Sequence, residues 1–176
     1  KEVAALMSAR GSSTRASVGP IEGMINLGAG DPDFNQPEFI NKAVYDAMVA
    51  GHTHYSFSGE PDFKAAIAKY YEKYGVEIDP KTQVLVTSGG SQAIFQAFAA
   101  ILDPGDEVIA FDPAYSGGTM VPAYFGAKTV FSPMKKDDTG MNDFDAEELK
   151  KRIGPKTKAL YVENPGNPSG KVYGKK

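Results

Sequence analysis

The chain has 176 residues, 41% of them hydrophobic, a formal net charge of -3 and no cysteine. This size and apolar fraction suit one domain with a sizeable core, and the missing cysteines exclude disulfides and thiolate metal sites. The two histidines do not make a metal centre without further ligands. No basic face indicates nucleic acid, and no apolar run is long enough to cross a membrane. We therefore expect a soluble, cytoplasmic protein without metal, nucleic-acid or membrane partners.

The N-terminal part of the chain predicts an arm, one short strand and two helices. Its first residues are small and polar, and glycine and serine interrupt any helix begun there. Further on, proline stands at the start of two segments with apolar residues at helical spacing, and glycine follows each. The predicted elements are the arm at 1–19, a strand at Met24–Leu27, a helix from Pro37 to before Gly51, and a helix from Pro61 to before Gly75.

From Thr82 onward, strand patterns alternate with helix patterns. Such alternation predicts an α/β fold with a mostly parallel sheet flanked by helices on both faces. Ligands of such sheets bind beyond the carboxyl ends of the strands. The predicted strands are Val84–Thr87, Glu107–Phe111, Lys128–Phe131 and Ala159–Val162, the helices are Ser91–Leu102, Gly118–Phe125 and Asp145–Ile153, and a hairpin-like turn lies at Asp137–Gly140.

The stretch Val84–Phe95 joins a β-branched run to a helix through a Ser-Gly-Gly-Ser turn. Ser91 can cap this helix, and Gly89 and Gly90 allow a ligand to approach the backbone closely. The free N–H groups of the first helical turn and the helix dipole favour an anion, with phosphate the natural choice. A plain strand-to-helix connection that binds nothing is the alternative, and the turn alone does not decide between them.

Two further turns are predicted beyond strand ends, one at Asp112–Tyr115 and one at Asn164–Gly170. Tyr115 could lay its ring on a planar ligand, or serve as a half-buried packing residue. Asn167 could offer its amide to a ring oxygen or a substrate carboxylate, or simply be a turn residue before proline. Together with the glycine turn, they suggest a phosphorylated aromatic cofactor, without choosing between a nucleotide and another ring.

Nucleotide folds with known glycine motifs fit the sequence poorly. The first turn lacks the Gly-x-Gly-x-x-Gly spacing of dinucleotide-binding folds. Asp112 is the nearest acidic residue at the end of the next strand, and its position does not clearly serve a ribose. No Gly-x-x-x-x-Gly-Lys-Ser/Thr occurs, which excludes a P-loop on the same grounds.

Several stretches, taken together, resemble the class I/II aminotransferases that use pyridoxal phosphate, most closely the aspartate and aromatic branch. They occur in the order and roughly at the intervals of that family. The matching stretches are Leu27–Phe34, His54–Ile67, Val86–Phe95, Ile101–Val108, Asp112–Tyr115 and Asn164–Gly170. The resemblance implies fold type I, with an arm and a strip of the small domain at 1–50 and an incomplete cofactor-binding large domain at 51–176.

The resemblance also implies a set of site residues, a homodimer, and amino-acid and 2-oxo-acid substrates. Tyr55 is placed on the neighbouring subunit's cofactor, although the segment from Tyr55 to Gly59 is one residue shorter than usual. Lys64 stands where the family often has arginine, on a predicted helix surface. By this correspondence, Gly90, Ser91 and Gln92 form the phosphate cup, Tyr115 stacks on the pyridine ring, Asn167 binds the ring oxygen and the substrate carboxylate, Gly30 meets the substrate, and Tyr55 reaches the partner's phosphate.

The chain departs from the family most at its end. Members of the family are longer, and the lysine that forms the Schiff base and the arginine that clamps the α-carboxylate have no counterpart here. Lys135 lies in a Ser-x-x-Lys sequence, but at a strand exit in the wrong part of the chain, so we reject it as the catalytic lysine. We expect the 176 residues alone to be inactive. A lyase or synthase of the same fold, or a non-catalytic fragment that offers an interaction surface, are the alternatives.

Overall fold

The computed structural model describes residues 23, 25, 30, 32 and 34–174. The chain divides into two compact units, Lys1–Leu85 and Val86–Lys176. The domain boundary that the sequence suggests after residue 50 stays a prediction. The strand predicted at Met24–Leu27 falls mostly outside the described residues.

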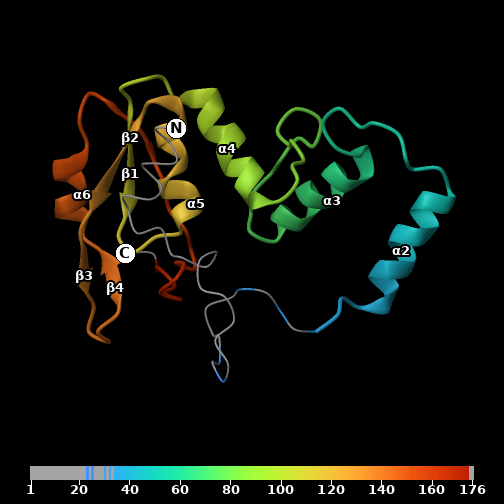
Figure 1. Cartoon of the computed structure of the whole chain (residues 1–176), viewed down its shortest axis with the longest axis horizontal. Helices are drawn as coiled ribbons and strands as arrows, with labels where there is room; N and C mark the ends of the chain where they lie inside the picture. Colours follow the sequence, from blue (N-terminus) through green and yellow to red (C-terminus); the bar gives the residue numbers. More distant parts are fainter. Residues whose placement is uncertain (1–22, 24, 26–29, 31, 33, 175–176) are drawn as a thin grey trace. The chain divides into compact units, whose positions relative to one another are not determined.

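The first unit contains two helices, α2 at Glu38–Val49 and α3 at Pro61–Glu72 (Figure 1). Pro37 occupies the N-cap of α2 with φ of -56° and ψ of 141°, and Pro61 is the first residue of α3. Both places suit proline, because its missing N–H would have no partner in the first turn of a helix. Both helices are confirmed.

Lys64 of α3 is buried, which corrects the prediction that it lies on a helix surface. Its side chain is 7% exposed, and Nζ donates to the Ser58 Oγ at 3.3 Å and the Lys81 carbonyl oxygen at 3.4 Å. The ammonium lies under the segments that precede and follow the helix, and their carbonyl and hydroxyl oxygens replace part of its water. Helical spacing alone does not show which loops cover a face.

The second unit is built on a three-stranded parallel sheet in the order β2-β1-β5. Its strands are β1 at Glu107–Phe111, β2 at Lys128–Ser132 and β5 at Thr157–Leu160. In the register, Ile109 of β1 lies between Val130 of β2 and Leu160 of β5. The sheet confirms the α/β fold with parallel strands.

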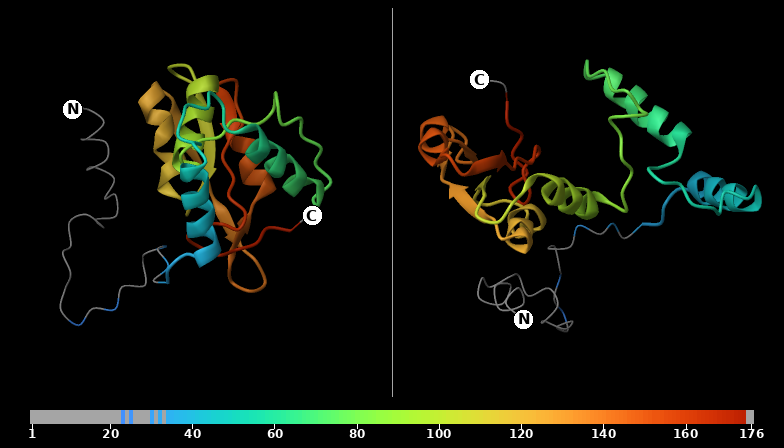
Figure 2. Two further views of the ribbon diagram at one scale, coloured as in Figure 1. Left: turned by 90° about the vertical axis from the view of Figure 1, so that its right-hand side faces the viewer. Right: turned by 90° about the horizontal axis from the view of Figure 1, so that it is seen from above.

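Helices flank this sheet on opposite sides. Helix α6 packs on β2, and α4 packs against α5 and the 3-10 helix η1. Figure 1 shows α6 on one side of β1 and β2 and α5 on the other, and the view from above in Figure 2 agrees. The bounds are α4 Gly90–Ile101, α5 Ser116–Thr119, η1 Val121–Phe125 and α6 Ala146–Arg152.

An antiparallel hairpin continues from the carboxyl end of β2. It pairs β3, Met134–Lys136, with β4, Asn142–Phe144. Asp137 holds its turn by accepting hydrogen bonds from the backbone N–H groups of Thr139 at 2.8 Å and Met141 at 3.0 Å. The turn predicted at Asp137–Gly140 is thereby confirmed.

Three predicted elements differ in the structure. Val84–Thr87 forms no strand, because no described strand pairs with it. The last strand, β5, spans Thr157–Leu160 rather than Ala159–Val162, because its pairing with β1 ends where Leu160 lies opposite Ile109, followed only by the bond from the Tyr161 N–H to the Ile109 carbonyl oxygen. The helix predicted at Gly118–Phe125 is split into α5 and η1, and Pro122, which has no N–H to donate, lies at the start of the second piece.

β1 forms the centre of the core. Its residues 108–111 are all buried, as expected for a parallel strand covered on both faces. Phe98 and Leu102 of the α4 segment pack with Val108 and Ala127 in one hydrophobic cluster. The continuous apolar run of β1, and not an alternating one, is the sequence feature that identifies this central place.

We expect Ile109→Ala to destabilise the protein strongly. Ile109 is 1% exposed, and truncating a buried isoleucine costs about 2–5 kcal/mol through lost burial and the cavity left behind. Leu160, its register partner in β5, is 48% exposed and is the matched control, for which we expect a cost of about 1 kcal/mol or less. Denaturant unfolding measures both, and equal losses would contradict the assignment of β1 to the core.

Candidate active site

The site begins at the N-terminus of α4. Gly89 is its N-cap with φ of 82° and ψ of 167°, a conformation that residues with a side chain rarely adopt. The helix starts directly at Gly90, so Ser91 is its second residue. No side chain caps the helix, which corrects the prediction that Ser91 does. The helix begins directly after Gly89, the residue with positive φ, and therefore one residue earlier than predicted.

The first N–H groups of α4 are available to a ligand. Among the described residues, the backbone N–H groups of Gly90 and Ser91 donate to no protein acceptor. A Cβ added to Gly89 or Gly90 would meet no atom within 4 Å, so the approach to these groups is open. The Gln92 side chain closes the turn, because its Oε1 accepts from the Ser88 N–H at 2.5 Å.

Tyr115 follows β1 and forms the N-cap of α5. Its N–H donates to Oε2 of Glu163 at 3.0 Å, and its carbonyl oxygen accepts from the Gly118 N–H at 3.1 Å. Its ring lies against Gly117, where an added Cβ would come within 2.3 Å of the ring carbon Cε1. The residue is 39% exposed, so its side chain is supported by Gly117 and still partly accessible.

Asn167 lies in a turn that is closed by its own ends. The Asn164 side chain accepts from the Tyr173 N–H at 3.0 Å and donates to the Tyr173 carbonyl oxygen at 3.2 Å. Inside this closure, the Gly166 N–H donates to the Lys171 carbonyl oxygen at 2.8 Å. Asn167 itself is exposed at the tip. The turn therefore presents its amide group outward from a fixed base.

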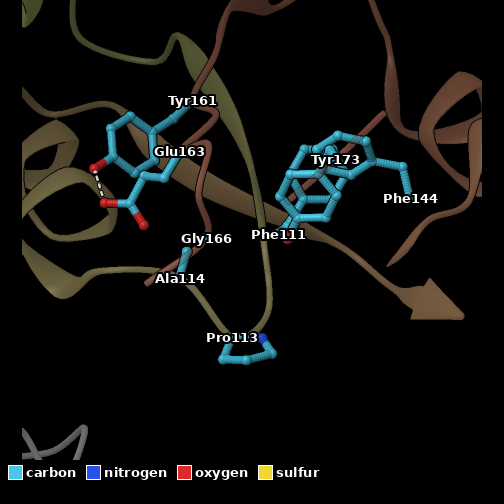
Figure 3. Close-up of a pocket in the computed structure, with 8 residues that line it drawn as sticks. All are labelled: Phe111, Pro113, Ala114, Phe144, Tyr161, Glu163, Gly166 and Tyr173. Carbon is cyan, nitrogen blue, oxygen red and sulfur yellow. Dashed lines mark hydrogen bonds between the residues drawn. The ribbon is translucent and has the colours of Figure 1, made fainter. Parts of the chain in front are cut away.

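A hollow lies between the two turns at the carboxyl ends of β1 and β5 (Figure 3). It is a small hollow that is open to solvent. Most of its lining side chains are aromatic, and Glu163 contributes a carboxylate. The lining includes Phe111, Pro113, Phe144, Tyr161, Glu163 and Tyr173.

The rings on one wall of the hollow are stacked. Tyr173 lies on Phe144 with centroids 4.0 Å apart and an interplanar angle of 19°, and Phe144 contacts Phe111 at 4.4 Å. Figure 3 shows the three rings together. This stack ties the end of the Asn167 turn to β1 through the hairpin strand β4.

An ion pair fastens the same turn to the hairpin. The Lys171 ammonium contacts the Asp137 carboxylate, and both side chains are largely shielded, at 16% and 17% exposure. The hydrogen bond from Lys171, followed by that from Thr139, lowers the pKa of the Asp137 carboxyl far below its ordinary value. The same contact raises the pKa of Lys171. Both groups are therefore charged across the physiological range.

Residues expected elsewhere in the site lie apart from this group. Gly30 and Tyr55 belong to the first unit, where Tyr55 is 99% exposed, and their roles stay predictions. Lys135 is exposed in the middle of β3, opposite Asp143 across the hairpin. In the described part of the chain, no helix is long and apolar enough to cross a membrane, and no three metal-binding side chains gather.

The family model of aminotransferase class I and II matches residues 22–176. The chain belongs to the class I and II aminotransferases. Aromatic-amino-acid aminotransferase 2 of Thermococcus litoralis is 37% identical over 160 residues, which make up 89% of this chain and 40% of that protein. The aspartate/prephenate aminotransferase of Thermus thermophilus is 37% identical, covering 86% of this chain and 39% of its own length. This chain thus spans about two fifths of the curated relatives it matches.

Solved aminotransferase structures share the fold. N-succinyldiaminopimelate aminotransferase from Mycobacterium tuberculosis matches with a TM-score of 0.81 and 33% identity, over 98% of this chain and 42% of that one. Aspartate aminotransferase from Thermus thermophilus with maleate matches with a TM-score of 0.76 and 39% identity, over 84% and 38% of the two chains. The expected fold type I is thereby confirmed.

Glu163 is a residue of this candidate site that the sequence did not predict. It accepts hydrogen bonds from the Tyr161 hydroxyl at 2.6 Å and the Tyr115 N–H at 3.0 Å, and so joins the two turns. Burial raises the pKa of the Tyr161 phenol above its ordinary value, and the bond to Glu163 raises it further. A charged residue directly after an apolar strand, at the ligand-binding edge of the sheet, was the available signal.

We expect Lys171→Met to lower the melting temperature clearly more than Lys150→Met. The Lys150–Glu147 pair is the matched control, with side chains 70% and 75% exposed, and solvent screening leaves such pairs little net energy. Removing the ammonium of Lys171 instead leaves a shielded carboxylate without its partner.

The difference between these two variants depends on pH through Asp137. Its native pKa is depressed, so the stabilisation is complete above the ordinary carboxyl pKa of about 3.9 and is lost as the pH falls toward the native value. Thermal unfolding at pH values from 7 down to 3 measures this. A Lys171→Met effect that does not shrink in acid would show that the ion pair is not its source.

Proposed function

We propose that the protein is an aminotransferase that uses pyridoxal phosphate and moves an amino group from an amino acid to a 2-oxo acid. Membership of the aminotransferase family supports this, and so does the arrangement at the carboxyl edge of the sheet. The relatives named for aromatic amino acids and for aspartate favour amino acids of these classes as donors, and the name prephenate in the second favours a 2-oxo acid of that kind as acceptor. A cytoplasmic homodimer in which Tyr55 serves the partner's site is part of the proposal.

The observation that carries the proposal is the pair of unpartnered N–H groups at the start of α4, together with a partly exposed tyrosine at the start of α5, the helix that packs against α4. Gly90 and Ser91 present two backbone donors, and the helix dipole adds to their attraction for a phosphate dianion. Tyr115 offers a ring face of the size of a pyridine, and α4 packs against the helix that Tyr115 caps. These residues fit a phosphorylated aromatic ring.

Each residue then has a defined task. Gly90, Ser91 and Gln92 hold the phosphate, with the Gln92 side chain fixing the turn from inside. Tyr115 supports the ring from one face, and Asn167 donates its amide to the ring oxygen or the substrate carboxylate. Pyridoxal phosphate, when bound, supplies the electron-withdrawing ring that makes the Cα proton of an amino acid acidic. The described residues orient this ring, and the base that moves the proton is not among them.

We expect Ser91→Ala and Tyr115→Ala to weaken the binding of pyridoxal phosphate. A hydrogen bond to a charged group contributes about 1.5–3 kcal/mol, so loss of the Ser91 hydroxyl should reduce affinity roughly tenfold or more. Loss of the stacking ring, worth about 0.5–1.5 kcal/mol, should reduce it by up to about tenfold. Fluorescence titration with pyridoxal phosphate measures both dissociation constants.

Gln96→Ala is the control for the Ser91 variant, because Gln96 lies on an exposed face of the same helix. It should bind the cofactor as the unmodified protein does. If Ser91→Ala and Tyr115→Ala also retain full affinity, the proposed site is wrong.

We expect the 176-residue chain alone not to transaminate. The described residues hold and orient a cofactor, but none is placed to move the substrate proton. Formation of 2-oxo acid from aspartate, tyrosine or phenylalanine, with 2-oxoglutarate as acceptor, measures this activity. Turnover by the short chain would contradict the division of tasks described above.

A further inference from the structure

We propose that Glu163 is a positioning residue that holds Tyr115 in place for the cofactor ring by anchoring it to Tyr161. This inference rests on the proposed function, because it assigns how one of its binding residues is oriented. Its basis is a chain of contacts that runs from the core of the second unit to the exposed ring of Tyr115.

The chain of contacts starts at Tyr161, which is fixed by its surroundings. Its backbone N–H donates to the Ile109 carbonyl oxygen at 2.8 Å, which ties it to the central strand. Its ring packs beside the buried Phe98 with centroids 6.4 Å apart, and covers Gly118 so closely that an added Cβ would lie 1.9 Å from the ring. The hydroxyl of Tyr161 is therefore held at a defined point.

Glu163 lies two residues after Tyr161, and Figure 3 shows the two side chains pointing toward each other. Oε1 accepts from the Tyr161 hydroxyl at 2.6 Å, as Figure 3 shows, and Oε2 accepts from the Tyr115 N–H at 3.0 Å. The two oxygens of one half-buried carboxylate thus join a fixed hydroxyl to the backbone of Tyr115. Hydrogen bonds to an ionised acceptor are stronger than neutral ones, which makes this link stiff.

At the far end, Tyr115 has little freedom left. Its N–H donates to the Glu163 carboxylate, its carbonyl oxygen accepts from the Gly118 N–H, and its ring lies against Gly117. Of these three constraints, the last two come from the short helix α5 that Tyr115 itself begins. Glu163 supplies the one that comes from a distant part of the chain, 48 residues away. Without it, the ring would move with the end of α5.

The test compares the unmodified protein with its Glu163→Ala, Glu163→Gln and Tyr161→Phe variants. Two probes separate the roles, since pyridoxal phosphate has a ring that meets Tyr115, and inorganic phosphate has none. For Glu163→Ala we expect affinity for pyridoxal phosphate to fall by about as much as for Tyr115→Ala, up to about tenfold. Affinity for inorganic phosphate should stay the same, because the start of α4 is untouched.

The conservative variant separates positioning from loss of fold. Glu163→Gln keeps an oxygen for the Tyr115 N–H, and its amide can donate to the Tyr161 hydroxyl, so cofactor affinity should return to near that of the unmodified protein. Tyr161→Phe removes the anchor and keeps the carboxylate, and should lie between Glu163→Ala and Glu163→Gln. The visible circular dichroism of the bound cofactor should change in the same order.

A double-mutant cycle shows whether Glu163 acts through Tyr115. If it does, Glu163→Ala combined with Tyr115→Ala binds pyridoxal phosphate no more weakly than Tyr115→Ala alone. The inference would be overturned if the double variant lost affinity by the product of the two single losses. It would also be overturned if Glu163→Ala weakened the binding of pyridoxal phosphate and inorganic phosphate equally, or lowered the melting temperature with unchanged cofactor affinity. Full cofactor affinity of Ser91→Ala and Tyr115→Ala would overturn the proposed function and, with it, this inference. Weakened binding in those two variants, with Glu163→Ala unaffected, would overturn the inference alone.

Discussion

The parallel pairing of β1 with β5 is the constraint on which the rest of the site depends. Two parallel neighbours end at the same edge of a sheet, so the residues that follow them meet there although they are far apart in sequence. Tyr115 and Glu163 leave these two strands and form a hydrogen bond of 3.0 Å across 48 residues. An antiparallel arrangement of the same strands would place the two turns at opposite edges, and neither the hollow nor the link between the turns would exist.

The residues at this edge fall into two groups with different environments. The residues proposed to face a ligand, Ser91, Tyr115 and Asn167, are exposed. Those that hold them, Glu163, Asp137 and Lys171, are half-buried and use their side chains on other parts of the unit. This separation leaves the ligand-facing groups free, while shielding strengthens the bonds of the supporting ones.

The sequence predicts best what depends on neighbours along the chain. The bounds of β1 were correct because its continuous apolar run is set between two turns, and Pro37 and Pro61 marked both early helices. It predicts less well what depends on distant partners. Val84–Thr87 has the composition of a strand but no paired strand among the described residues, and Lys64 is buried by segments that helical spacing does not reveal. Glu163 was missed for the same reason, because its meaning comes from a contact 48 residues away.

A carboxylate in a site proposed to bind a phosphate needs a physical reason, since its charge has the same sign as that of the phosphate. The geometry supplies one in the way Glu163 is used. Both of its oxygens are taken by donors, the Tyr161 hydroxyl and the Tyr115 N–H, so that much of its charge is satisfied within the protein. A neutral acceptor in its place would bind the same donors more weakly. The repulsion left over acts on a phosphate proposed to bind at the N-terminus of α4, where the helix dipole favours the anion. We therefore expect Glu163 to weaken phosphate binding less than it strengthens binding of the ring by fixing Tyr115.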